Sequence, residues 1–141
     1  IDKNGKKMRL TKSADFALRI VTYLAQVQKP CTMTELSTRL HITYNNLSKI
    51  VQKLNKSKII QTKQGKYGGV ELIQKSEDLS LKLIVYSIDG PTQLTECLNN
   101  PGYCGLSKGC RLKGALGDIQ TKIDDIFENV KISDLLEKQE A

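Results

Sequence analysis

The segment that most constrains the architecture reads Thr34-Glu-Leu-Ser-Thr-Arg-Leu40-His-Ile-Thr-Tyr44-Asn-Asn-Leu-Ser-Lys-Ile-Val-Gln-Lys-Leu54. It predicts two short helices, at 34–40 and 44–54, joined by a tight turn over 41–43. In the second helix the apolar residues share one face, while the start of the helix is polar. Two helices arranged in this way are typical of a helix-turn-helix. The shared apolar face consists of Leu47, Ile50, Val51 and Leu54.

The polar start of the second helix suits recognition of base edges. An asparagine can bond an adenine edge through two hydrogen bonds, and a lysine can reach guanine or a phosphate. A solvated helix face would have the same composition, so the pattern alone leaves that alternative open. The candidate DNA-binding residues of this helix are Thr43, Tyr44, Asn45, Asn46, Ser48 and Lys49.

Directly after this helix the sequence predicts a β-hairpin. Short strands are expected at 59–62 and 70–73, with a glycine-rich, basic segment at 63–69 between them. A hairpin in this position is a wing, whose lysines can contact the DNA backbone or enter the minor groove. Its candidate DNA-binding residues are Lys63, Gln64, Lys66 and Tyr67.

The charge of the 141-residue chain is unevenly distributed. The net charge is +7, yet residues 1–75 carry fifteen Lys and Arg against four Asp and Glu, whereas residues 76–141 carry seven against eleven. A basic first half predicts a polyanionic partner, and we expect double-stranded operator DNA rather than a membrane. No apolar run reaches the roughly 18 residues of a membrane span and no signal peptide opens the chain, so we expect a cytoplasmic protein.

The remaining periodicity predicts two further helices around this head. Apolar steps of three and four residues indicate an amphipathic helix at 11–26, with Asp15 in its first turn, and another helix at 79–88. The fold class is therefore mainly α, a winged helix-turn-helix with a two-stranded wing and a long C-terminal dimerisation helix. The expected units are a disordered leader or cloning remnant (1–7), the DNA-binding head (8–75), a connecting helix (76–96), a cysteine loop (97–110), and a dimerisation helix with a tail (111–141).

Three of the four cysteines fall within fourteen residues, in Cys97-Leu-Asn-Asn-Pro-Gly-Tyr-Cys104-Gly-Leu-Ser-Lys-Gly-Cys110. The proline and glycines predict a loop. Such a loop lets several sulfurs converge and lets backbone N–H groups bond thiolates, as an iron–sulfur cluster requires. In a reducing compartment, cysteines point to metal or redox chemistry more than to a disulfide framework.

Other interpretations of these cysteines stay open at the level of sequence. One disulfide with a spare thiol, or three inert thiols, would need the same residues. Zinc is possible, but no CxxC pair is present, and structural zinc sites usually have tighter ligand spacing. Cys31 lies far from the others in sequence and is expected to be a plain, partly buried thiol.

The C-terminal segment carries an apolar heptad seam. Its steps of four and three residues predict a helix that must bury this stripe, and a second copy of the chain is the simplest cover. Packing of the stripe against its own domain is the alternative. The seam consists of Leu112, Leu116, Ile119, Ile123, Ile126 and Val130, of which Leu116, Ile119, Ile123 and Ile126 are the candidate homodimer interface.

The sequence offers no catalytic constellation. His41 is the only histidine and lies in the turn between the two head helices, where a structural or DNA-backbone role is expected. No Ser-His-Asp set, paired carboxylates with a histidine, or glycine-rich phosphate loop can be assembled. We therefore expect that the chain is not an enzyme.

Four motifs together resemble the winged-helix iron–sulfur transcription repressors, the family of NsrR and IscR. The resemblance covers residues 8 to about 135, and its most specific part is the three-cysteine loop after a wing. The motifs are Met8-Arg-Leu-Thr-Lys-Ser-Ala-Asp15-Phe-Ala-Leu-Arg19, Asn45-Asn-Leu-Ser-Lys-Ile-Val51, Gly65-x-x-Gly68-Gly69 and Cys97…Cys104…Cys110-x-Leu112-Lys113.

The resemblance implies a homodimer that holds an iron–sulfur cluster on Cys97, Cys104 and Cys110, with operator binding controlled by the cluster. IscR-like members carry a histidine where this chain has Lys113, which cannot ligate while protonated, whereas NsrR-like members keep an aspartate that Asp15 matches. The resemblance thus favours the nitric-oxide-sensing NsrR branch. It implies a 4Fe–4S cluster, with 2Fe–2S possible, and Asp15 of the partner subunit as a possible fourth ligand.

The chain departs from the family pattern in two places: six residues rather than five separate its first two loop cysteines, and Gln64 stands where many members have arginine. The longer cysteine interval affects cluster geometry, and Gln64 affects operator contacts. Alternatives of the same fold are a regulator that senses iron–sulfur status or thiol redox state. A cluster-free regulator controlled by a protein partner is the other alternative.

Overall fold

The computed structural model describes residues 9–106 and 109–136, so the expected leader (1–7) lies outside the described residues, as do residues 137–141 of the expected tail. Ten helices and strands follow one another along this part of the chain. They are α1 (Lys12–Val27), α2 (Met33–Leu40), α3 (Tyr44–Lys56), β1 (Ile60–Lys63), β2 (Gly69–Leu72), η1 (Ser76–Asp78), α4 (Leu81–Asp89), η2 (Glu96–Leu98), α5 (Arg111–Asn129) and η3 (Ile132–Leu135).

Threonine caps begin the first three helices. The side chains of Thr11, Thr32 and Thr43 each accept a hydrogen bond from the backbone N–H three residues later. Each cap satisfies one of the backbone donors that a helix start leaves unpaired, a contribution of about 1 kcal/mol. His41 ends α2 in the left-handed conformation, with φ 54°. The single histidine therefore forms the turn of the helix-turn-helix.

The head has one apolar core, into which α1, α2, α3 and the wing all project side chains. Each large apolar side chain buried there contributes roughly 1.5–3 kcal/mol relative to exposure. The seam of α3 faces inward, as its periodicity predicts, which leaves the polar start of the helix on the surface. The fully buried residues of this core include Ile20, Leu36, Leu47, Leu54, Ile60 and Val70.

The wing is an antiparallel pair of strands in which Ile60 lies opposite Leu72 and Lys63 opposite Gly69. Its second strand is also bonded to the loop before α2. The N–H of Cys31 donates to the Val70 carbonyl at 2.9 Å, and the N–H of Val70 donates to the Cys31 carbonyl at 2.7 Å. The loop before the helix-turn-helix thus fixes the wing to the head.

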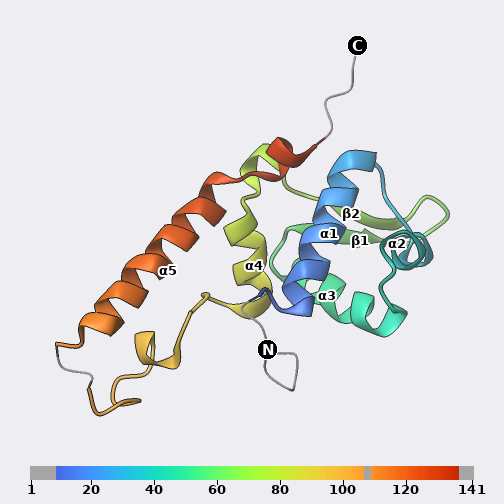
Figure 1. Ribbon diagram of the computed structural model, residues 1–141. Helices are drawn as coiled ribbons and strands as arrows, with labels where there is room; N and C mark the ends of the chain where they lie inside the picture. The colour runs from blue at the N-terminus through green and yellow to red at the C-terminus, as the bar shows by residue number, and fades with distance from the viewer. Residues whose placement is uncertain (1–8, 107–108, 137–141) are drawn as a thin grey trace.

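Helix α4 packs on α1 and α3, and the chain then leaves the head. Gly90 ends α4 at φ 75°, a conformation that glycine adopts without strain. Figure 1 shows α5 extending from the head, with the cysteine loop at its far end. This arrangement separates the cysteines of this loop from the head of the same chain.

The other end of α5 is attached to the head by a short return segment. The N–H of Ile132 donates to the Leu79 carbonyl at 2.8 Å, and the N–H of Leu81 donates to the Val130 carbonyl at 3.0 Å. Ile132 is fully buried in the core of the head. Helix α5 ends at Asn129, so Val130, the last residue of the expected seam, is its C-cap, and the chain then continues into η3.

The predicted architecture is otherwise confirmed, with boundaries that differ by one or two residues. The wing strands begin and end one residue away from their expected positions, because register and hydrogen bonds rather than residue type determine strand ends. The cysteine loop is not wholly irregular, since Cys97 lies in η2. No helix in the described part of the chain is long and apolar enough to cross a membrane.

Candidate nucleic-acid interface and cysteine pocket

The first turn of α3 presents the polar residues that the sequence predicts as DNA contacts. Tyr44, Asn45 and Asn46 are exposed, as is Lys49 one turn later, whereas Ser48 is half-buried. The Thr43 hydroxyl oxygen accepts the N–H of Asn46 at 3.4 Å, so this threonine also begins the helix. The predicted DNA contacts therefore lie on a capped helix whose apolar face is buried in the core.

The wing places its basic residues on the same head. Lys63 Nζ lies 2.8 Å from Glu71 Oε1, and Gln61 Nε2 donates to the same oxygen at 2.6 Å. These hydrogen bonds, first that of Lys63 and then that of Gln61, hold the pKa of Glu71 below its usual range. At the tip, the Lys66 ammonium lies 5.8 Å from the centre of the exposed Tyr67 ring. Lys63 is a predicted DNA contact, and its pairing with a carboxylate was not expected from the sequence.

The three loop cysteines line one pocket of ≈ 570 Å³ between the cysteine loop and the start of α5. The structure thus brings together the thiols that their spacing predicts as ligands. Most of the other lining residues are apolar or uncharged, which the sequence did not predict as part of the site. The walls include Leu94, Thr95, Tyr103, Leu106, Leu112 and Leu116.

Each loop cysteine has a different environment. Cys110 is the N-cap of α5, and its sulfur accepts the N–H of Lys113 at 3.5 Å. The sulfur of Cys97 lies 2.9 Å from the Thr95 hydroxyl oxygen, whereas Cys104 is exposed. The first turn of α5 therefore directs a backbone N–H group at the sulfur of Cys110.

The donor set fits an iron–sulfur cluster in its chemistry, because thiolates are the usual protein ligands of such clusters. Within residues 9–106 and 109–136, no three His, Cys, Asp or Glu side chains form a group that could hold a metal ion. The pocket therefore gathers three thiols without placing them in ligand geometry. Asp15, the predicted fourth ligand, is not among the residues that line it.

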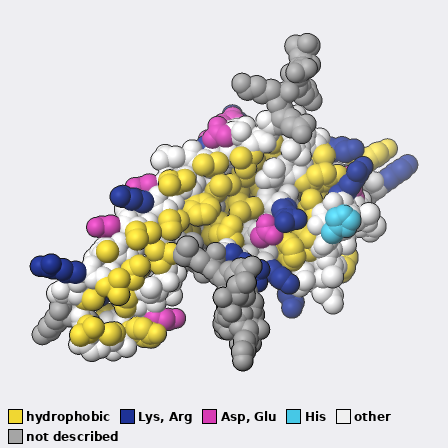
Figure 2. Space-filling view, viewed as in Figure 1, with side chains coloured by type: hydrophobic (Ala, Val, Ile, Leu, Met, Phe, Trp, Pro, Cys, Tyr) yellow, Lys and Arg dark blue, Asp and Glu magenta, His cyan; other side chains and the backbone are white. Residues whose placement is uncertain are grey.

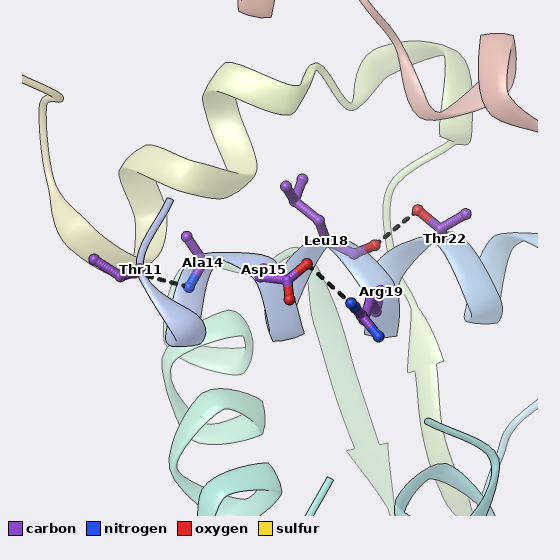
Figure 3. Close-up of polar contacts among 6 residues, drawn as sticks. All are labelled: Thr11, Ala14, Asp15, Leu18, Arg19 and Thr22. Carbon is purple, nitrogen blue, oxygen red and sulfur yellow. Dashed lines mark hydrogen bonds and ion pairs between the residues drawn. The ribbon is translucent and has the colours of Figure 1, made fainter. Parts of the chain in front are cut away.

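Asp15 lies instead on the surface of α1. Its Oδ1 accepts from Arg19 Nε at 3.1 Å, one turn along the helix, as Figure 3 shows. Figure 3 also shows the Thr11 cap at the start of the helix, and the Thr22 hydroxyl donating to the Leu18 carbonyl. Because both members of the ion pair are exposed, Asp15 is available to a second molecule.

Cys31 is separate from the other thiols, as expected, but it is fully rather than partly buried. Burial raises the pKa of its thiol, and the nearby Glu35 carboxylate raises it further. Such a thiol stays protonated and unreactive at neutral pH. The backbone of Cys31 pairs with that of Val70, so this residue has a structural role.

The candidate dimer seam is largely uncovered in one chain, since no residue of α5 is buried. Ile119 is 48% exposed and Ile126 is 65% exposed, while Leu116 and Ile123 are half-buried. Figure 2 shows hydrophobic side chains gathered in a band along this helix. The C-terminal part of α5 packs against α4, where Leu81 and Ile123 line an apolar pocket, and α5 also contacts η2.

Sequence comparison places the chain among regulators of transcription. Residues 10–138 match the Rrf2 family, described as an iron-dependent transcriptional regulator. The chain is 32% identical over 136 residues to the HTH-type transcriptional regulator NsrR of Halalkalibacterium halodurans, which covers 94% of this chain and 93% of that protein. It is 29% identical to the HTH-type transcriptional repressor NsrR of Streptomyces coelicolor, over 92% of this chain and 88% of that one.

Solved structures share the fold at low sequence identity. The global cysteine regulator CymR of B. subtilis superposes with a TM-score of 0.75 at 16% identity, covering 92% of this chain and 96% of CymR. IscR of T. potens superposes with a TM-score of 0.74 at 13% identity, covering 91% and 85%. These likenesses confirm the winged helix-turn-helix architecture.

Proposed function

The chain belongs to the Rrf2 family of iron-dependent transcriptional regulators, and on that basis we propose that it is a cytoplasmic repressor whose operator binding is controlled by an iron–sulfur cluster. Its role as a DNA-binding regulator follows from the family. The cluster and its signal are the proposal. The observation that carries it is the single pocket lined by Cys97, Cys104 and Cys110.

Three thiolates from one pocket would supply three of the four ligands of a 4Fe–4S cluster, with a 2Fe–2S cluster as the second choice. When bound, the cluster supplies an iron that can react with a small molecule such as nitric oxide. Lys113 donates its backbone N–H to the sulfur of Cys110, so it contacts the candidate ligand through its main chain. Leucine side chains form part of the pocket wall, while Cys104 itself stays exposed.

The fourth ligand would be Asp15 of a second copy of the chain. Asp15 does not line the pocket of its own chain, and its side chain is 45% exposed. A carboxylate oxygen suits iron less well than a thiolate, so this bond would be the weakest of the four. Loss of the bond between iron and Asp15 would free α1 of the head from the cluster. The head would then have two states, one with this bond and one without it.

This arrangement requires a homodimer, which we propose forms through α5. The exposed seam from Leu116 to Ile126 needs a cover, and an operator with two half-sites needs two reading helices. In each head, the start of α3 would read base edges in the major groove while the wing contacts the backbone or the minor groove.

Iron and sulfide analysis of protein purified without oxygen tests the proposal. The wild-type protein should be brown and contain about four iron atoms per chain if the cluster is 4Fe–4S. Cys97→Ala, Cys104→Ala and Cys110→Ala should each lose iron, whereas the matched control Cys31→Ala should retain it. Colourless, iron-free wild-type protein that binds DNA with full affinity would instead support a cluster-free regulator controlled by thiol oxidation or a protein partner.

A further inference from the structure

A basic groove of ≈ 370 Å³ lies between α1 and α3, and of its lining residues Lys49 alone is among the predicted DNA contacts. Ser13 of α1 forms part of one wall, and the second half of α3 forms the other. None of its lining residues is acidic. The groove is lined by Ser13, Lys49, Ile50, Gln52, Lys53 and Lys56.

Three lysines project from α3 into this groove at positions 49, 53 and 56. Spacings of three and four residues put them on one face of the helix, where like charges repel one another. All three are exposed, and neither of the ion pairs found in the described residues involves them. An anion between them would relieve this repulsion, so the arrangement favours a negatively charged ligand.

The end of α4 holds the two walls together. Lys53 Nζ donates to the Ile88 carbonyl at 3.4 Å, and the Thr11 hydroxyl donates to Asp89 Oδ2 at 2.6 Å. One helix end is thus bonded both to α3 and to the cap of α1. The groove is therefore built before any ligand arrives, and its shape depends on a helix that leads directly into the cysteine loop.

We propose that this groove is a second DNA contact, which binds backbone phosphates next to the bases read by the first turn of α3. The proposal rests on the DNA-binding function proposed above. A helix lying in the major groove is flanked by the phosphates of both strands, and lysines are suitable partners for them. Lys49 lies one turn after Asn45 on the same helix, so a duplex that meets the reading residues also meets the near end of the groove.

The groove would position the protein on the duplex rather than read the base sequence. Phosphate contacts fix the register of a protein on a duplex and carry no direct sequence information. Loss of a groove contact should therefore weaken binding to every duplex by a similar factor. An acidic segment of another protein is the alternative ligand, and it would leave the affinity for DNA unaffected by changes in the groove.

The test is the salt dependence of duplex DNA affinity for Ser13→Asp and Lys56→Ala. Ser13→Asp adds a negative charge to the groove, yet an acidic residue in the first turn of α1 suits the helix dipole and should keep the head folded. Lys56→Ala removes one phosphate contact per subunit. The matched control is Lys122→Ala, which removes the same charge from exposed α5.

For a dimer, Lys56→Ala should flatten the slope of log affinity against log salt by about 1.8, or ~0.9 for each lost contact. Ser13→Asp should weaken binding at least as much, and Lys122→Ala should match the wild type. Ethylation interference should show that Lys56→Ala loses sensitivity at particular phosphates. Equal slopes for Lys56→Ala and the wild type, with unchanged interference, would overturn the groove proposal alone. A wild-type protein that binds no duplex would overturn the function on which it rests.

Discussion

At the scale of single residues, Asp15 is the side chain whose exposed position matters most to the account. Its ion pair with Arg19 joins exposed groups at 3.1 Å along one helix, and such pairs stabilise by only about 0.3–0.5 kcal/mol. Stability of the isolated chain does not therefore require this carboxylate. A role toward a second molecule explains its placement better than helix stability does.

Asp15→Ala should distinguish a role of Asp15 as a cluster ligand from a role in the stability of the fold. We expect an unfolding temperature close to that of the wild type, because the lost pair is exposed and weak. Iron should still bind to the three thiolates, but the variant should bind the operator poorly or fail to respond to nitric oxide. Anaerobic iron analysis beside a DNA-shift assay makes the comparison. Behaviour identical to the wild type in both assays would reduce Asp15 to a helix-dipole residue.

Glu71 predicts a pH dependence of the wing. Hydrogen bonds from Lys63 and Gln61 lower its pKa from the usual 4.5, so folding favours the charged form. The resulting stabilisation is fully present above pH 4.5 and is lost as pH falls through the lowered pKa. Between about pH 7 and pH 3, the unfolding temperature of the wild type should fall more than that of Glu71→Gln. Parallel pH profiles for the two proteins would contradict the assignment.

At the scale of elements, the wing depends on a close approach that only glycine permits. Gly69 has φ 149°, and a Cβ there would lie 2.6 Å from the Cys31 carbonyl oxygen. This carbonyl is the one that accepts the N–H of Val70. Any larger residue at position 69 must therefore push the second wing strand away from the loop before α2.

Gly69→Ala should destabilise the head by about 1–3 kcal/mol, since it combines backbone strain with a steric clash. Thermal unfolding measures this loss, and DNA affinity should fall with it because the wing shifts. Gly105→Ala is the control, because a Cβ at that position meets nothing within 4 Å. An unfolding temperature equal to that of the wild type would show that the strand and loop are not held as closely as the structure indicates.

The sequence predicted each of these elements because each has a local signal. Periodicity predicted α3 and the seam of α5, and glycines between β-branched residues predicted the wing. The return of Ile132 into the core was not predicted, because a single apolar residue after a helix has no periodicity. The basic groove was missed for a related reason: Ser13 and Lys56 are 43 positions apart, and only the packing of α1 on α3 brings them together.

The sequence predicted which cysteines would lie together, but not the shape of the pocket that they line. Three cysteines in one loop indicated convergence, and they do line one pocket. The wall contributed by Leu116 depends on how the loop folds back over the first turns of α5, which residue spacing does not determine. The pairing of Lys63 with Glu71 likewise follows from strand register.

At the scale of the whole molecule, the uncovered stripe on α5 predicts a dimer. Replacing Ile119 and Ile123 together with Asp would place charges in an apolar seam, at a cost of several kcal/mol for the association. The variant should sediment as a monomer and lose operator binding, while its head stays folded. Asp118→Asn, on the same helix and exposed, is the control. An unchanged dimer would show that the subunits meet elsewhere.

The affinity of anaerobically purified protein for one duplex, selected from random sequence, tests most directly whether the cysteine pocket controls DNA binding. Fluorescence anisotropy would give the dissociation constant before and after addition of nitric oxide. We predict that nitric oxide raises it about tenfold or more, a coupling of at least ~1.4 kcal/mol, and that Cys104→Ala shows no such change. A brown wild-type protein that loses its colour in nitric oxide yet binds the duplex with an unchanged dissociation constant would contradict the account.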